Sequence, residues 1–218
     1  MIRRWLRRFF GLTNSDGQKR HAKWPTREEI PLLPPFDALE LKDIVEVATP
    51  RGAQRAYQEL LEEGIVGFDT ESKPTFKKGE VSTGPHVAQF ATRDRAYIFM
   101  LHEPECRKTA AKLIGSNSLK KVGFGLREDL RLIHKKLRVE PNEVFDLDAM
   151  FMEKGYGRGV GVKVGVAIAL KRRFSKSKKI STSNWMQQHL SDRQLLYAAN
   201  DAFAALQVFH VLKAMPPA

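Results

Sequence analysis

The order in which strand-like and helix-like segments follow one another narrows the folds open to this chain. A helical pattern over residues 49–63 leads into an apolar run over residues 64–71. Strand-like runs over residues 85–92 and 95–101 come next, with a tight turn between them. After these neighbouring strands, helices and strands alternate to the end of the chain. This order predicts an α/β fold in which helices flank a mixed central sheet.

The later segments complete this pattern and suggest the domain boundaries. We expect helices over residues 104–114, 128–137, 159–170 and 191–215, and strands over residues 120–125 and 143–149. A chain of 218 residues is long enough for one domain with a substantial core. We therefore expect a single domain over residues 37–218, preceded by a basic arm and linker over residues 1–36.

The chain is basic, with a formal net charge of +12, and this charge is unevenly distributed. Residues 1–27 contain eight Lys or Arg residues against one Asp. A second basic segment consists of Lys171, Arg172, Arg173, Lys176, Lys178 and Lys179. Basic segments often meet phosphate backbones or anionic membranes, although a run of charges is more commonly a solvated face. Charge therefore suggests nucleic acid as a partner but does not establish it.

The first eleven residues are amphipathic if they are helical. Their apolar side chains recur three and four residues apart, with four arginines between them. Three interpretations stay open: a membrane-surface helix over residues 1–12, a transit-type leader, or an arm that docks on the domain or on nucleic acid. The stretch over residues 13–35, rich in Pro, Lys, Arg and Ser, predicts a mobile linker.

Two features bear on the cellular compartment. The single cysteine, Cys106, excludes an internal disulfide and a cysteine-based zinc site, and it fits a reducing compartment. We find neither the continuous apolar segment of a secretory signal nor an apolar run long enough to cross a bilayer. We therefore expect a cytoplasmic protein, with an organellar leader as the alternative.

A pair of carboxylates closes the first apolar strand. In the segment GFDTES, Asp69 and Glu71 are two residues apart, so on a strand both side chains point to the same face. Like charges this close repel each other and are costly to bury unless a cation neutralises them. Carboxylate oxygens are the ligands that Mg²⁺ and Mn²⁺ prefer. The alternative is a strand end that enters solvent, where two acids need no further explanation.

Two later acids carry a weaker signal when each is taken alone. Asp129 lies in the first turn of a helix that follows the glycine-punctuated strand KKVGFG, where any acid stabilises the helix dipole. Tyr197 and Asp201 are four residues apart on the last helix, so they share one face, and apolar residues surround them. A carboxylate on an apolar face needs a partner. That partner is either Tyr197, a basic residue such as Arg193, or a metal ion.

Taken together, these segments resemble a known family. Over residues 47–212 the chain contains, in order, GFDTES, KKVGFGLREDL, FDLDAMF, STSNW and LSDRQLLYAANDAFAAL. This series resembles the DEDD exonuclease superfamily in its tyrosine-containing (DEDDy) branch, and it is similar to ribonuclease D-like and Werner-type exonuclease domains. The resemblance implies a ribonuclease H-like fold. It also implies a 3′→5′ exonuclease that hydrolyses phosphodiester bonds at the 3′ end of single-stranded or recessed nucleic acid and releases nucleoside 5′-monophosphates.

The resemblance also implies roles for individual residues. Two Mg²⁺ or Mn²⁺ ions would be held by four acids: Asp69, Glu71, Asp129 and Asp201. Tyr197 would position the attacking water, and Glu71 would also contact the terminal 3′ hydroxyl. By the same analogy, the basic segment over residues 171–179 would hold phosphates of the substrate strand. Many relatives carry Asn or His shortly before the second-motif Asp, whereas this chain has Phe124 there, which leaves the substrate open.

Two rival functions belong to other classes. One is a catalytically silent nucleic-acid-binding module of the same fold, and the other is a membrane-associated adaptor that works through the amphipathic arm. The presence of all four acids and the tyrosine favours the enzyme. DNA against RNA and the oligomeric state stay open. The residues expected to be structural are Phe36, Phe68, Phe90, Cys106, Asp146 and Trp185.

Overall fold

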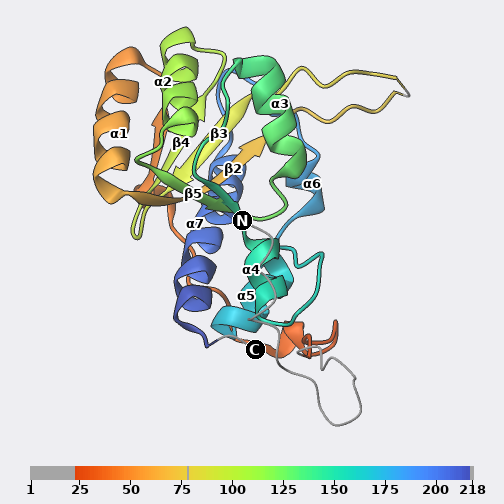
Figure 1. The fold of residues 1–218 in the computed structure, drawn as a ribbon. Helices are drawn as coiled ribbons and strands as arrows, with labels where there is room; N and C mark the ends of the chain where they lie inside the picture. The colour runs from red at the N-terminus through yellow and green to blue at the C-terminus, as the bar shows by residue number, and fades with distance from the viewer. Residues whose placement is uncertain (1–22, 78, 217–218) are drawn as a thin grey trace.

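The fold is a mixed sheet with helices on both faces, seen in a computed structural model that describes residues 23–77 and 79–216. Within these residues the sheet has six strands in the order β1-β4-β3-β2-β5-β6 (Figure 1). The strands are β1 Ile44–Val47, β2 Ile65–Glu71, β3 Val87–Ala91, β4 Ala96–Met100, β5 Lys120–Gly123 and β6 Val144–Asp146. β3 runs antiparallel to both β2 and β4, and the other pairings are parallel. The predicted α/β fold with a mixed sheet is therefore confirmed.

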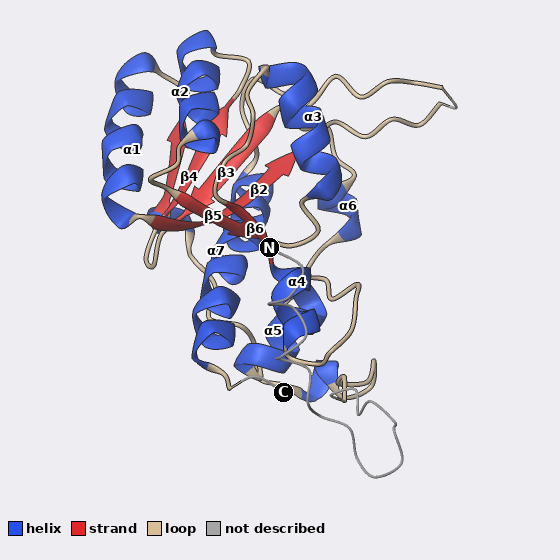
Figure 2. Cartoon of the chain, in the orientation of Figure 1, coloured by secondary structure: helices blue, strands red, loops and turns tan. Residues whose placement is uncertain are grey.

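Helices cover both faces of the sheet (Figure 2). They are α1 Pro50–Glu63, α2 Pro104–Gly115, α3 Arg127–Leu137, α4 Leu147–Glu153, α5 Val162–Leu170, α6 Lys178–Ser181 and α7 Asp192–Ala214, with short 3₁₀ turns at Ile30–Leu32 and Leu41–Asp43. β3 is buried along its whole length because alternate side chains face different layers. Ala88 and Phe90 pack in the layer of α1 and α2, whereas Val87 and Ala91 pack against α7.

Most of the aromatic residues that the sequence predicts to be structural are buried in the core. Phe68 and Phe90 are fully buried, with ring centroids 5.2 Å apart. Phe36 is half-buried and packs on Phe174 and Phe203, at centroid distances of 5.4 and 5.8 Å. Trp185 is fully buried. These side chains join the sheet and its two helical layers into one domain.

Helix α7 lies across the sheet and contacts β2, β3, β4 and β5. Its first turn is stabilised by Ser191, whose hydroxyl accepts a hydrogen bond from the backbone N–H of Gln194, while the Gln194 side chain accepts one from the backbone N–H of Ser191. The helix is long and apolar enough to cross a membrane, contrary to the sequence-based expectation of no such run. Most of that length is buried against the sheet, which is typical of the core helix of a globular domain.

A glycine on β2 sets how closely α7 approaches the sheet. A Cβ atom added at Gly67 would lie 1.9 Å from the backbone oxygen of Ala202 and 2.7 Å from its carbonyl carbon. No side chain fits at this distance, so only glycine lets the helix backbone lie directly on the strand. Gly67 is two residues before Asp69, and Ala202 follows Asp201. The close approach therefore brings the side chains of Asp69 and Asp201 near each other.

Some predicted boundaries are wrong, and local backbone chemistry explains why. The strand predicted over residues 143–149 ends at Asp146, because the Asp146 carboxylate accepts a hydrogen bond from the backbone N–H of Asp148 and caps α4. The helix predicted from residue 159 begins only at Val162, since Gly159 has a φ of +84° that an α-helix does not accommodate. The sequence pattern also missed the short elements β1 and α6.

Residues 23–35 are ordered against the domain, so this described part of the segment does not form the predicted mobile linker. The indole N–H of Trp24 donates a hydrogen bond to the carbonyl of Tyr156, at 2.5 Å. Arg173 donates to the carbonyl of Pro31, at 2.8 Å, and the backbone N–H of Phe36 donates to the carbonyl of Arg173, at 3.0 Å. The basic arm up to residue 22, including the membrane contact predicted for residues 1–12, lies outside the described residues. That contact and the cytoplasmic location stay predictions.

Candidate active site

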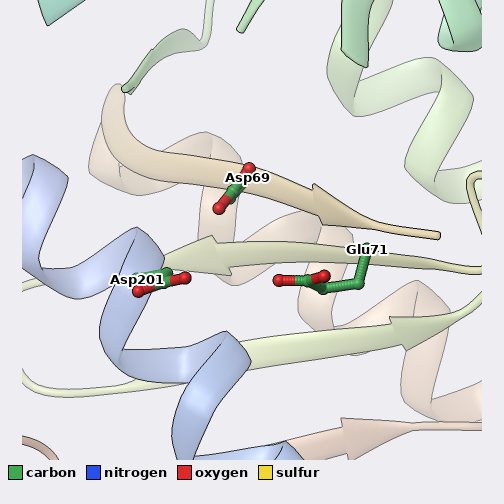
Figure 3. A group of neighbouring side chains, drawn as sticks. All are labelled: Asp69, Glu71 and Asp201. Atoms are coloured by element: carbon green, nitrogen blue, oxygen red, sulfur yellow. The ribbon is translucent and has the colours of Figure 1, made fainter. Parts of the chain in front are cut away.

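Three carboxylates from two distant parts of the chain meet where β2 ends. Asp69 and Glu71 come from β2, and Asp201 comes from the middle of α7 (Figure 3). One oxygen from each acid lies within 4.8 Å of the others. The side chains of Asp69 and Glu71 share one face because they are two residues apart on a strand, and Asp201 reaches them because α7 lies directly on Gly67. The structure thus joins three of the four acids proposed from the sequence.

The fourth acid, Asp129, lies beside this cluster in the first turn of α3. Its carboxylate accepts a hydrogen bond from the hydroxyl of Thr70, at 2.5 Å. Thr70 stands between Asp69 and Glu71 on β2, so one hydrogen bond ties α3 to the strand that carries the other acids. Burial raises the pKa of Asp129, and the bond from Thr70 opposes that rise.

Burial makes the charge of this cluster costly. Desolvation raises the pKa of Asp69 well above its ordinary value, and the nearby charges of Asp129 and Asp201 raise it further. Glu71 is only 9% exposed, and burial together with the charge of Asp69 raises its pKa to about 10. A nearby cation is required if all of these carboxylates are to be ionised together at neutral pH.

The donor set fits a hard divalent cation. Both carboxylate oxygens of Asp201 are sealed from solvent, and the close partner of Oδ2 among the described residues is the ammonium of Lys176, 2.5 Å away. Burial raises the pKa of Asp201 as well. Buried carboxylate oxygens that converge from three side chains are suited to Mg²⁺ or Mn²⁺. The residues present therefore match the predicted metal site in chemistry.

Tyr197 lies one helical turn before Asp201 and is largely buried. Its ring packs on Trp185, with centroids 5.8 Å apart, which confirms the predicted position of Trp185 beside the site. The indole N–H of Trp185 donates to the carbonyl of Ser181, at 3.2 Å, and so ties the ring to the end of α6. Burial, followed by the charge of Asp201, raises the pKa of Tyr197 to about 12. The phenol is therefore protonated at neutral pH and can donate a hydrogen bond.

The predicted basic segment divides into different environments. Lys176 lies inside the acidic cluster, with its Nζ 2.5 Å from an Asp201 oxygen. Arg172 pairs with Asp37 at 3.7 Å, and Arg173 holds the segment before the domain. The other three basic side chains of the segment are exposed and can contact an anion in solution: Lys171, Lys178 and Lys179. No local pattern in the sequence indicates the contact of Lys176 with Asp201, because the two residues are 25 positions apart on different elements.

A cleft of about 630 Å³ opens onto the cluster. Its lining includes Asp69, Asp201 and Lys176 as well as the rings of Phe68 and Phe124. The cleft is large enough for a mononucleotide-sized group, and both charged and aromatic side chains line it. It is the candidate substrate site.

Two acids outside the cluster shape one wall of this cleft. The carboxylate of Asp146 accepts hydrogen bonds from the backbone N–H groups of Gly125 and Leu126, at 3.1 and 2.9 Å, besides the one from Asp148. This confirms the structural role predicted for Asp146. The side chain of Asp148 accepts from the backbone N–H groups of Gly159 and Val160, at 2.7 and 3.0 Å, a role that no local sequence pattern indicates.

The predicted inertness of Cys106 fits its surroundings. The thiol is fully buried, and burial raises its pKa to about 12, so the reactive thiolate is absent at neutral pH.

The model of a family described as "3'-5' exonuclease" matches residues 44–216. An Arabidopsis thaliana protein named 3'-5' exonuclease is 30% identical over 162 residues, which are 72% of this chain and 56% of that protein. The mouse bifunctional 3'-5' exonuclease/ATP-dependent helicase WRN is 29% identical over 150 residues, which are 68% of this chain and 11% of that protein. The chain thus spans about half of one relative and about a tenth of the other.

Solved structures share the same arrangement of sheet and helices. The Aedes aegypti Nibbler EXO domain superposes with a TM-score of 0.67 at 22% identity, covering 81% of this chain and 89% of that one. Escherichia coli RNase D superposes with a TM-score of 0.68 at 16% identity, covering 78% of this chain and 44% of that one. At these identities the likeness concerns the fold, and it confirms the predicted ribonuclease H-like architecture.

Proposed function

Because this chain belongs to the 3'-5' exonuclease family, we propose that it hydrolyses nucleic-acid strands one nucleotide at a time from their 3′ ends, in a reaction that depends on divalent metal ions. The observation that carries this proposal is the meeting of Asp69, Glu71 and Asp201 beside an open cleft that Asp69 and Asp201 line. A purely structural site has no need to bury three acids whose oxygens converge. A silent binding module would not be expected to retain them.

Each residue has a distinct part in the proposed reaction. Asp69, Glu71 and Asp201 would hold Mg²⁺ or Mn²⁺, with Asp129 as the fourth predicted ligand. When bound, two such ions activate water and stabilise the charge that develops on the departing 3′ oxygen. Tyr197 remains a neutral phenol and would donate a hydrogen bond that orients the attacking water. The ring of Trp185 fixes the position of that phenol.

The substrate is proposed to be a single-stranded or recessed 3′ end of DNA or RNA, and the product a nucleoside 5′-monophosphate. A Trypanosoma brucei RNase D of the same fold, with a TM-score of 0.68, has been seen in complex with RNA U12. The exposed lysines Lys171, Lys178 and Lys179 could neutralise phosphates of such a strand without reading its sequence.

The proposal is tested with 5′-labelled DNA and RNA strands of one sequence, incubated with Mg²⁺, Mn²⁺ or EDTA and resolved on a gel. We expect a descending ladder that requires metal, and the faster substrate identifies the preferred nucleic acid. Asp201→Asn should abolish the ladder, whereas Asp192→Asn, an exposed acid on the same helix, should leave it intact. Intact strands under every metal, with folded protein, would refute the enzyme and favour the binding module.

A further inference from the structure

Lys176 places an ammonium group where the carboxylates of the site converge. Its Nζ lies 2.5 Å from Oδ2 of Asp201, whose side chain is only 3% exposed, while 30% of the lysine side chain stays exposed. The same Nζ lies 5.1 Å from the ring centroid of Tyr197 and makes a cation–π contact. Lys176 therefore contacts two of the residues to which the proposed reaction gives a role.

This charge acts on the whole cluster. The ammonium lowers the pKa of Asp69, Glu71 and Asp129, in opposition to their burial. Lys176 also lies on the irregular segment between α5 and α6, whereas Asp201 lies in the middle of a 23-residue helix. A lysine ammonium is a compact charge on a flexible four-carbon stem. If a second cation approaches Asp201, the lysine is the partner that can move.

We propose that Lys176 is the internal counter-cation of the acidic cluster and that it yields Asp201 to a divalent metal ion when one binds. An ammonium 2.5 Å from the carboxylate and a divalent ion cannot share the same oxygen, because like charges repel strongly at such distances. The exchange keeps the buried acids neutralised in both states. The freed ammonium would stay at the cleft that Lys176 already lines, where the phosphate of a substrate would lie. This inference rests on the metal-binding part of the proposed function.

The exchange predicts that Lys176 weakens metal binding. Lys176→Met keeps the length of the side chain and removes its charge, so a divalent ion would no longer have to break an ion pair. We expect the affinity for Mn²⁺ to rise about tenfold, the factor that corresponds to about 1.4 kcal/mol. Lys163→Met is the matched control, because Lys163 is exposed and its charge reaches Asp201 without an ion pair.

The test is a calorimetric titration of the full chain with Mn²⁺, together with thermal unfolding in EDTA and in saturating Mn²⁺. We expect tighter binding in Lys176→Met, nearly unchanged binding in Lys163→Met and in Lys176→Arg, and a lower melting temperature of Lys176→Met in EDTA that recovers with Mn²⁺. Equal affinities for the wild type and Lys176→Met, or an equal gain in both methionine variants, would overturn the exchange. Wild-type protein that binds Mn²⁺ but cleaves no strand would refute only the proposed function.

A second, independent observation concerns the loop over residues 72–86, which joins β2 to β3 and projects from the body of the domain (Figure 1). Its base is fixed at the site, since the backbone N–H of His86 donates to the carbonyl of Glu71, at 2.9 Å. Near its tip Phe76 is 79% exposed. The backbone N–H groups of Phe76 and Lys77 donate to Glu80, at 3.1 and 3.2 Å, so the aromatic ring is held on a turn.

We infer that this loop, called the arm below, contacts the nucleic-acid strand as it approaches the carboxylates, which again rests on the proposed function. The described residues of the arm include two lysines, Lys73 and Lys77, and one acid, Glu80, so their charge suits a phosphate backbone. An exposed ring can also stack on a base of any identity. Phe76 is five residues from Glu71, so their Cα atoms are at most about 18 Å apart. That upper limit corresponds to at most about five stacked nucleotides at 3.4 Å each.

The arm is tested with Phe76→Ala on strands of 3 and 20 nucleotides, with Leu32→Ala as the control because Leu32 is equally exposed elsewhere. We expect KM for the 20-mer to rise about tenfold in Phe76→Ala, and kinetics on the 3-mer and of Leu32→Ala to be unchanged. An equal loss on both lengths, or no loss, would refute the contact. Fluorescence anisotropy of the 20-mer in EDTA measures the same contact without catalysis, so it tests the arm even if the enzyme hypothesis fails.

Discussion

Gly67→Ala is the change that the structure makes most informative, because it adds one methyl group between β2 and α7. The added carbon would lie 1.9 Å from the backbone oxygen of Ala202, whereas ordinary contacts of this kind begin at 3.4 Å. The helix must therefore retreat by about 1.5 Å. Backbone of a long, buried helix cannot move locally, so we expect a cost near the upper end of overpacking, about 3 kcal/mol.

This retreat has a stability consequence and a functional one. For a chain of this size about 3 kcal/mol corresponds to a melting temperature lower by roughly 6–12 °C. Asp201 precedes Ala202, so it moves away from Asp69 with the helix. A misplacement of about 1 Å at a reacting centre costs roughly 100-fold in rate. We therefore expect weaker Mn²⁺ binding and about 100-fold slower strand cleavage.

The assay combines thermal unfolding, Mn²⁺ titration and cleavage of a labelled strand for the wild type, Gly67→Ala and Gly161→Ala. Gly161 is the control, because an added methyl group meets nothing within 4 Å there and its φ of −82° suits any residue. We expect the control to melt within about 2 °C of the wild type. If Gly67→Ala keeps the melting temperature and the metal affinity of the wild type, the close approach of α7 to β2 and its link to the position of Asp201 are refuted.

Three further changes test other parts of the structure. Asp146→Ala removes an acceptor shared by three backbone N–H groups, so we expect the free energy of unfolding in urea to fall by about 2–3 kcal/mol. A fall below about 0.5 kcal/mol would contradict the structural role of Asp146. Lys121 is buried, and burial lowers its pKa to about 8. Above pH 8 the folded protein has therefore lost this proton while the unfolded chain still binds it, so stability rises with pH. We expect the free energy of unfolding to rise by roughly 1–2 kcal/mol between pH 8 and 9.5 in the wild type but not in Lys121→Met. Identical pH profiles would show that the ammonium is not desolvated. Tyr197→Phe keeps the ring on Trp185 and removes the phenolic hydrogen bond, so kcat should fall roughly 100-fold at an almost unchanged melting temperature; an unchanged kcat would remove Tyr197 from the mechanism.

Features that depend on neighbours in the chain were predictable from the sequence. Thr49 before Pro50 predicts the start of α1, and its hydroxyl does accept a hydrogen bond from the backbone N–H of Gly52. Strand periodicity places Asp69 and Glu71 on one face, because alternation along a strand needs no partner. Helix periodicity aligns Tyr197 with Asp201 in the same way. The order of the elements then predicts the mixed sheet.

Features that depend on how distant segments of the chain pack together could not be predicted from the sequence. The strand predicted through residue 149 stops at Asp146, because that carboxylate also binds backbone N–H groups about 20 residues earlier in the chain. Lys176 reads as one charge in a basic run, and only the path of the segment before α6 puts it on Asp201. The hydrogen bond from Thr70 to Asp129 spans 59 residues.

The distance between the acids themselves belongs to this second class. Asp69 and Asp201 are 132 residues apart in the chain, and no local preference of either residue brings them together. They meet because Gly67 leaves room for the backbone of α7 on β2, and because burial of the apolar face of that helix holds it there. Local periodicity in the sequence therefore determines which side chains face inward. Long-range packing determines which of these side chains meet in one site.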